Sequence, residues 1–176
     1  MKYTQQQIAT ADGAYIAPNS FTLDYLKAQI KKLAKFPADL EKTIAPLSKE
    51  KLDTPYRDGG WTLAQVVHHI ADSHMQAFAR FKLTLTENTP TIKPYNQNDW
   101  VTTADCNVDA MVSVQLIKAL HIRLVALMET LNEADFAKQY NHPEYNKTFS
   151  LAFVTGMYAW HGAHHLQQIS MFLENQ

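Results

Sequence analysis

Apolar residues recur at three- and four-residue intervals over long stretches of this 176-residue chain, and only five glycines interrupt them. That spacing places apolar side chains on one face of an α-helix, whereas a half-buried strand needs strict alternation. We therefore expect an all-α fold. Its long helices are expected at about residues 22–47, 62–86, 109–131 and 150–173. Helices of this length predict a four-helix bundle.

Local signals place the ends of these helices. Thr62, followed three residues later by Gln65, fits a capping box, and Ser150 can cap the last helix. Pro37 is expected to break or restart the first helix, because proline removes a helical hydrogen bond. Residues 1–19 show no sustained period, so we expect an extended arm lying on the body.

Two connections stand out between the helices. The segment 88–107 contains Pro90 and Pro94 and is too long for an ordinary turn in a small bundle. Loops of that kind often cover a site. Residues 141–147 are rich in turn formers and precede the last helix.

Composition narrows the class of protein. With 46% hydrophobic residues and a net charge of −1, residues 1–176 are expected to form one compact domain. The sequence contains no cluster of basic residues interleaved with aromatics, so we do not expect nucleic acid as a partner. No run of about 18 apolar residues and no secretory layout at the N-terminus is present, so we expect a cytoplasmic protein without a membrane partner. Cys106 has no cation beside it and is interpreted as incidental.

His161 and His165 lie one helical turn apart, with Cβ atoms roughly 6 Å from each other. A heptad that starts at Leu151 places both on the inward seam, so two imidazoles can converge on one metal ion. Such a pair on a helix is common, however. The alternatives are imidazoles hydrogen-bonded to polar neighbours, or a rotation of the helix that turns them outward.

A third ligand has to come from elsewhere, and the second helix contains His68, His69 and His74. Successive helical residues differ by about 100° in direction, so one ligand is expected here. His69 lies on the more polar line and is slightly favoured. His74 lies on an apolar line, as a core histidine with one hydrogen bond would, and His68 is interpreted as a surface or supporting residue.

The stretch from Thr54 to Thr62, TPYRDGGWT, leads into Val66 to Met75, VVHHIADSHM, and resembles the YfiT group of the DinB-like superfamily. The runs RFKL at residues 80–83, TPTIKPY at residues 89–95 and YAWH with the following pair His164 and His165 are also similar. The likeness extends from about residue 52 to residue 173. The N-terminal helix agrees with the group only in general character.

This resemblance implies a DinB-like four-helix bundle that holds one divalent metal ion per chain, zinc or nickel, with His69, His161 and His165 as ligands. It also implies a homodimer. The family contains metal-dependent hydrolases and thiol S-transferases, bacillithiol transferases among them. The shared motif does not say which activity applies.

Three imidazoles leave a fourth position of a tetrahedral ion for water or substrate, as in catalytic zinc sites. Water bound there becomes a nucleophile for hydrolysis, and a bound low-molecular-weight thiol becomes a thiolate for transfer to a small-molecule substrate. A fourth protein ligand, such as His164 or His68, would instead indicate a non-catalytic, metal-stabilised bundle that binds a ligand or partner. Gly162 follows His161 where a metalloprotease HExxH motif has glutamate, which disfavours peptide hydrolysis by that mechanism.

The remaining site candidates are weaker. Gln168 can orient a metal ligand or the substrate, or be a buried glutamine satisfied by the backbone. Arg80 can meet an anionic substrate group or pair with an acidic residue. Tyr95, Asp99 and Trp100 in the long loop can wall a substrate pocket or simply anchor the loop.

Overall fold

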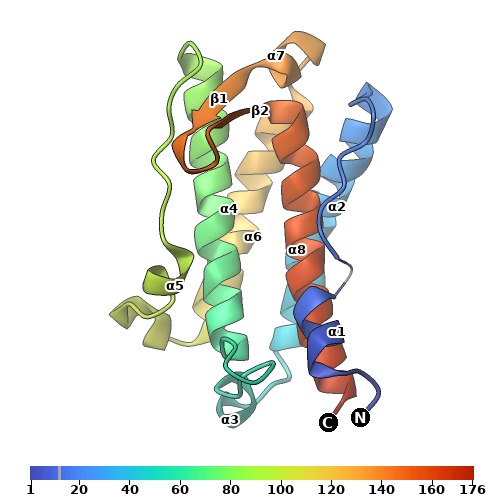
Figure 1. Ribbon diagram of the computed structural model, residues 1–176, viewed down its shortest axis with the longest axis vertical. Helices are drawn as coiled ribbons and strands as arrows, with labels where there is room; N and C mark the ends of the chain where they lie inside the picture. The colour runs from blue at the N-terminus through green and yellow to red at the C-terminus, as the bar shows by residue number, and fades with distance from the viewer. Residues whose placement is uncertain (12) are drawn as a thin grey trace.

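The computed structural model describes residues 1–11 and 13–176, and its four long helices form a bundle (Figure 1). They are α2 (Leu23–Ile44), α4 (Leu63–Thr86), α6 (Ala110–Glu129) and α8 (Leu151–Glu174). A side-chain cap begins each of them, from Thr22, Thr62, Asp109 and Ser150 respectively. At Thr62 the expected capping box with Gln65 is present. The four-helix bundle predicted from the spacing of apolar residues is confirmed.

The remaining elements are short. The helical ones are α1 (Gln5–Thr10), α3 (Lys49–Leu52), α5 (Gln97–Trp100), η1 (Ala104–Asn107), α7 (Glu133–Ala137) and η2 (Pro143–Tyr145). Strands β1 (Gln139–His142) and β2 (Lys147–Ser150) pair antiparallel, with Gln139 opposite Ser150. The segment expected to be only a turn is therefore a small hairpin, closed by Asn146 in the left-handed conformation. It covers one end of the bundle next to α4 and α8 (Figure 1).

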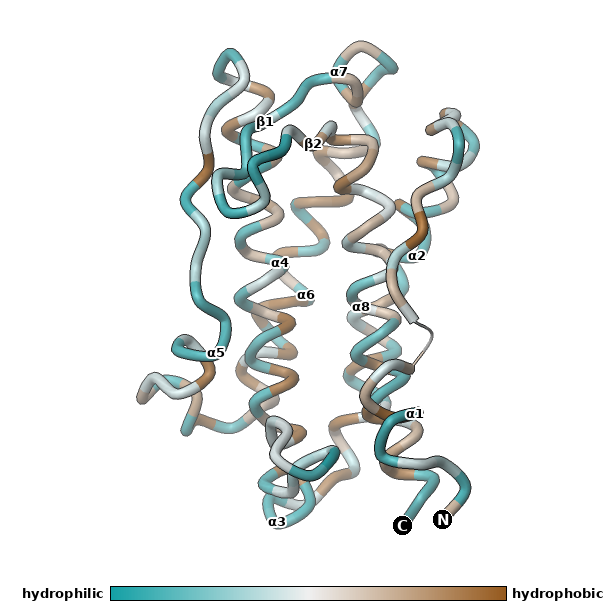
Figure 2. The backbone as a smooth tube through the Cα atoms, viewed as in Figure 1, coloured by the Kyte–Doolittle hydropathy of each residue, from teal (hydrophilic) through white to brown (hydrophobic). Residues whose placement is uncertain are grey.

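The bundle core has two apolar clusters along its length. Helices α2 and α4 each pack against both α6 and α8. One cluster includes Leu40, Val66, Ile117 and Ile169, and the other includes Ile30, Phe81, Leu124 and Tyr158. In Figure 2 hydrophobic segments recur along the long helices, whereas the hairpin is largely hydrophilic.

A layer of histidines lies where these two clusters meet. His74 on α4, His121 on α6 and His161 on α8 each fall in sequence between residues of one cluster and residues of the other. His69 lies just before this boundary on α4, between Val67 and Ile70 of the first cluster. His69, His74 and His121 are buried, with exposed fractions of 3%, 0% and 1%. Burying imidazoles requires hydrogen-bond partners or a metal, so this layer is the polar feature of the core to be explained.

The expected break at Pro37 is wrong, because α2 continues through this residue. Proline has no N–H, so the usual helical bond to the carbonyl oxygen of Leu33 is missing. A side chain takes its place: His121 Nδ1 lies 2.7 Å from that oxygen. The bundle thus supplies from α6 the donor that the helix lacks.

The arm at residues 1–19 is only partly extended. Residues Gln5–Thr10 form α1, because Thr4 and Gln7 make a capping box, and Ile8 is buried with 2% exposed. Tyr3 N–H donates to Asn175 Oδ1 at 2.8 Å, which fixes the start of the chain to the end of α8. The arm does lie on the body, as Figure 1 shows for α1 and α8.

Candidate metal centre

Three histidine side chains meet between α4 and α8. His69 comes from α4, and His161 and His165 come from successive turns of α8. One nitrogen from each of the three lies within 4.8 Å of the other two. The Nε2 atoms of His69 and His161 are 3.2 Å apart. Two ligands of one tetrahedral zinc ion, each at ~2.0–2.1 Å, are separated by about 3.3 Å. The donor set and its spacing therefore fit a divalent ion.

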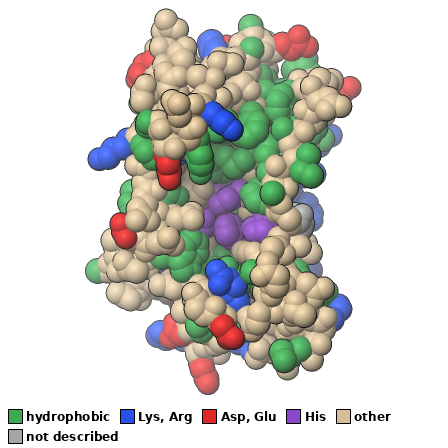
Figure 3. Space-filling model, viewed as in Figure 1, with side chains coloured by type: hydrophobic (Ala, Val, Ile, Leu, Met, Phe, Trp, Pro, Cys, Tyr) green, Lys and Arg blue, Asp and Glu red, His purple; other side chains and the backbone are tan. Residues whose placement is uncertain are grey.

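Solvent can reach this cluster. His69 is buried, whereas His161 and His165 are half-buried. In Figure 3 histidine side chains lie at the bottom of a hollow in the middle of this face of the molecule. The group contains three histidines and no fourth protein ligand among residues 1–11 and 13–176. An ion held there would keep a position open for water or substrate, as catalytic sites do.

Burial keeps these imidazoles neutral. It lowers the pKa of His69 to about 4 and the pKa of His165 to about 3. Burial, followed by the neighbouring histidines, lowers the pKa of His161 well below its usual range. A metal binds only the neutral ring through a bare nitrogen, so the three groups are ready to bind at pH 7.

Gln168 fixes which nitrogen of His165 is bare. Its amide Nε2 donates to the carbonyl oxygen of Ala9 at 2.7 Å, so its Oε1 faces His165 Nδ1 at 2.8 Å. An amide oxygen only accepts, so Nδ1 of the neutral ring carries the proton and Nε2 is free. Of the two roles expected for Gln168, the structure shows both: it orients the ring and bonds to the backbone of the arm.

A chain of three histidines fixes His161 in the same way. The carbonyl oxygen of Leu33 accepts from His121 Nδ1, so His121 Nε2 is bare and accepts from His74 Nδ1 at 2.8 Å. His74 Nε2 is then bare and accepts from His161 Nδ1 at 3.3 Å. Burial lowers the pKa of both His74 and His121, which keeps these rings neutral. The chain ends with a free Nε2 on His161, directed at the cluster.

His69 completes the set. Its Nε2 faces His161, while its Nδ1 is buried without a hydrogen-bond partner in the described part of the chain. The ring packs against Trp61, with ring centroids 4.8 Å apart. Packing rather than hydrogen bonding therefore orients this ring. His69 and His161 thus present Nε2 to one another, and the bare nitrogen of His165 is also Nε2.

Two other histidines of α4 differ from expectation. His74, expected to be a core residue with one hydrogen bond, is in the core but bonds to both His121 and His161. His68, expected at the surface or in support, is 4% exposed and bonds to Ser113 at 2.8 Å. Helix α6 packs over this side of α4, which buries His68 away from the cluster.

His121 was not singled out by the motifs. A signal for it exists: it interrupts the line Val114, Ile117, Leu124, Met128 at helical spacing on the buried face of α6. Gly162 has a packing role, since a Cβ there would lie 3.0 Å from the ring of Phe36. That ring in turn stacks on His74, with centroids 5.6 Å apart.

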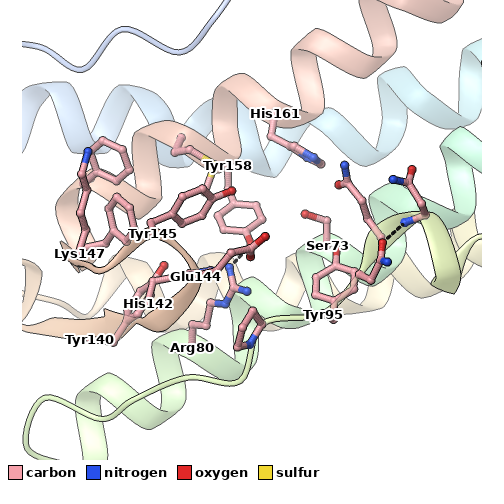
Figure 4. Close-up of a pocket in the computed structure, with 17 residues that line it drawn as sticks. Ser73, Arg80, Tyr95, Tyr140, His142, Glu144, Tyr145, Lys147, Tyr158 and His161 are labelled. Carbon is pink, nitrogen blue, oxygen red and sulfur yellow. Dashed lines mark hydrogen bonds between the residues drawn. The ribbon is translucent and has the colours of Figure 1, made fainter.

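A cavity of about 810 Å³ adjoins the cluster at His161 (Figure 4). Its walls include Ser73 and Arg80 from α4, Tyr158 from α8 and residues of the hairpin. Tyr95 lines it, as expected for the long loop. Asp99 and Trp100 are outside the lining set: Asp99 is exposed, and Trp100 packs behind Tyr95 with ring centroids 4.4 Å apart. The loop therefore walls the pocket through Tyr95, which Trp100 supports.

Comparison with known proteins gives the family. The sequence profile of the DinB superfamily matches residues 32–169. This chain belongs to the DinB superfamily. A relative from Bacillus mycoides is 42% identical over 162 residues, which cover 92% of this chain and 93% of the relative. A relative from Bacillus cereus is 43% identical over 158 residues, which cover 90% of this chain and 91% of that relative. Both bear the name "Putative metal-dependent hydrolase".

A solved structure is also similar. YfiT from Bacillus subtilis superposes with a TM-score of 0.93 at 38% identity, covering 96% of this chain and 97% of YfiT. That protein is described as a probable metal-dependent hydrolase with an unusual four-helix bundle topology. The resemblance to the YfiT group expected from the sequence is thereby confirmed.

Proposed function

We propose that this DinB protein is a metal-dependent hydrolase of a small molecule, with His69, His161 and His165 holding one zinc or nickel ion per chain. The observation that carries the proposal is the meeting of three histidine nitrogens, one from each ring, at the bottom of a hollow that is open to solvent and adjoins a cavity. The names of the relatives and of YfiT support the same class of reaction.

A divalent ion held by three imidazoles supplies Lewis acidity, which makes water or a thiol nucleophilic at neutral pH. The chain contributes the rest. Gln168 and His74 hold protons on the outer nitrogens of His165 and His161, so that the inner nitrogens stay bare. The apolar clusters pack the bundle on either side of the histidines, and the cavity beside His161 gives a substrate a route to them.

Thiol S-transfer is a second candidate, and the size of the cavity favours it. About 810 Å³ lies within the range of drug-sized ligand sites, so a thiol and an acceptor can be accommodated together. Both reactions use the same three ligands. The identity of the second reactant distinguishes them.

The test uses purified protein loaded in turn with zinc and nickel. It is assayed with a panel of small esters and amides, and separately with a low-molecular-weight thiol plus a halo-aromatic electrophile. Metal-dependent turnover of the panel, lost in His69→Ala and kept in His68→Phe, supports the hydrolase. His68 is a suitable control because it is a buried histidine of the same helix that bonds to Ser113 and lies outside both the ligand group and the cavity lining. Turnover of the thiol pair alone selects the transferase. Metal binding without either turnover selects the non-catalytic ligand-binding bundle.

We further propose that the protein is a homodimer that pairs through α6. Val112, Leu116 and Ile122 of this helix are exposed at 57%, 46% and 72%. Within the described residues α6 is also the one helix long and apolar enough to cross a membrane, with only 39% of the relevant window buried. A helix that is apolar on its outer as well as its inner face is accounted for by a second copy packing against it.

A further inference from the structure

The cavity beside the metal centre contains an arginine with no acidic partner. Arg80 is 8% exposed, and no carboxylate of the described residues lies within 4.0 Å of it. Its Nη1 donates to the hydroxyl of Tyr158 at 3.2 Å, while its buried Nε has no partner. A buried charge is normally paired, so this guanidinium lacks the anion that such burial calls for.

The surroundings of Arg80 suit a carboxylate. Figure 4 shows Arg80 and Tyr158 pointing toward one another in the cavity, with Tyr95 on the side nearer Ser73. Burial raises the pKa of Tyr95 and of Tyr140 to about 12, so both hydroxyls stay protonated at pH 7 and can donate to an anion. A guanidinium matches a carboxylate with two parallel hydrogen bonds.

The mouth of the cavity bears one charge of each sign. Glu144 and Lys147 of the hairpin line it, and both are exposed. They carry opposite charges, so together they add no net charge at the mouth. Arg80 is the buried cation among the residues lining the cavity. One buried positive charge balances a group with one negative charge, which favours a carboxylate over a doubly charged phosphate.

The distance between this arginine and the histidines sets the shape of the ligand. His69 and Arg80 are eleven residues apart, three turns of α4, so they share a face with Cα atoms about 16 Å apart along the axis. Tyr158 connects the two ends: its hydroxyl accepts from Arg80, and its ring lies 5.9 Å from the ring of His161, centroid to centroid. A ligand that reaches from Arg80 to His161 therefore runs past the aromatic side chains of Tyr158 and Phe153, which line the cavity.

We propose that Arg80, with the hydroxyls of Tyr158 and Tyr95, is a subsite for a carboxylate, and that the substrate is an elongated carboxylic acid whose other end reaches His161. The subsite itself stands on the arginine and the cavity. The placement of the reactive end at the histidines rests on the proposed function.

The probe is 3-phenylpropionate, with 3-phenylpropionamide as its neutral counterpart, titrated by calorimetry into the full chain with and without zinc. The acid is expected to bind in both states and the amide in neither. Arg80→Met is expected to weaken binding of the acid about 10- to 100-fold, the effect of losing a hydrogen bond to a charged group. Lys147→Met, the matched loss of a cation at the mouth, is expected to change it less than about three-fold because exposed ion pairs contribute little.

Several results would overturn the subsite. Binding of the acid that requires zinc and survives Arg80→Met would place the acid on the ion instead. Equal losses of affinity in Arg80→Met and Lys147→Met, or equal binding of the acid and the amide, would show that Arg80 does not recognise the carboxylate. Failure of the acid to bind at all would also reject the subsite. Tighter Arg80-dependent binding of phenyl phosphate would replace the carboxylate with a phosphate. Should Arg80→Met not fold, the Nε–H resonance of Arg80 in the wild type is expected to shift on titration, and an unmoved resonance would also reject the subsite. Binding to metal-free protein is independent of turnover, so failure of the hydrolase assay leaves this result interpretable.

Discussion

Pro37 lies four residues after Leu33 in α2, and the carbonyl oxygen that this proline cannot bond is the one that accepts from His121 Nδ1 at 2.7 Å. The free carbonyl oxygen of Leu33 in α2 thereby determines which nitrogen of His161 in α8 carries the proton. The hydrogen bonds run from Leu33 through His121 and His74 to His161. Because a neutral imidazole has one donor and one acceptor nitrogen, the acceptor at Leu33 determines which nitrogen of each following ring carries the proton. The metal centre is thus tied to both α2 and α6 as well as to the helices that bear its ligands.

The first prediction concerns the far end of this chain. His121→Phe is expected to weaken zinc binding about 10- to 100-fold, because partners that orient a metal-bound histidine typically contribute that much. His161 would lose the constraint that keeps its Nε2 bare. Competition with a chromophoric chelator measures the affinity. The control is His68→Phe, which removes another buried histidine of the bundle that bonds to Ser113 instead. Equal weakening in both variants would contradict the proposed chain.

The second prediction is the tautomer of each ring. In the metal-free protein at pH 7, four rings are expected to carry their protons on Nδ1: His74, His121, His161 and His165. The chain through His121, His74 and His161 starts at the carbonyl oxygen of Leu33, and His165 bonds to the amide oxygen of Gln168; both oxygens can only accept. Long-range nitrogen–proton correlation spectra of labelled protein distinguish Nδ1–H from Nε2–H rings. A proton on Nε2 of His121 would refute the assignment at its origin.

The bundle and two of the three histidines of its centre could be predicted because they depend on spacing within one helix. The interval between His161 and His165 fixes their shared direction, and the capping residues Thr62 and Ser150 fix where the helices begin. His69 could be chosen firmly only through the family resemblance. The pattern of α4 gives the angles between its histidines but not the rotation of that helix against α8.

What the sequence left open depends on contacts between helices. His121 belongs to the site through Leu33, and neither residue is marked by spacing. Pro37 was expected to end a helix because the local rule counts one lost hydrogen bond and cannot see a donor from α6. The hairpin of β1 and β2 was missed because each strand has only four residues, too few to show an alternating pattern.

Removal of the metal gives the third prediction. At a metal concentration of 100 times Kd, binding to the native state adds about 2.7 kcal/mol to the free energy of unfolding. For a chain of this size that corresponds to roughly 5–10 °C in Tm. Chelator is therefore expected to lower the Tm of zinc-loaded wild type by that amount and to leave His161→Ala unchanged. His142→Ala should keep the full shift, and an equal shift in His161→Ala would count against the ligand set.

The fourth prediction is a pH dependence of the metal-free protein. The pKa of His69 falls from 6.5 to about 4 on folding because of burial, so the unfolded chain takes up its proton first as the pH drops. Stability from this group is complete above pH 6.5 and is lost between pH 6.5 and 4. Between pH 7.5 and 5.0 His69 alone should account for roughly 2 kcal/mol of lost unfolding free energy. Urea titrations should show His69→Gln losing that much less than the wild type. Identical losses would mean that His69 titrates normally in the fold.

The last prediction tests the second copy. Ile122 is 72% exposed on the outer face of α6, which also bears the exposed Val112 and Leu116. A glutamate there would be buried without a partner if a second α6 packs against it, which costs several kcal/mol. Ile122→Glu is therefore expected to convert a dimer into a monomer in light scattering coupled to size exclusion. The matched control is Ile16→Glu, since Ile16 is 88% exposed on the N-terminal arm and lies outside α6. A wild type that elutes as a monomer at 100 µM, or an Ile122→Glu variant that stays dimeric, would exclude α6 as the interface.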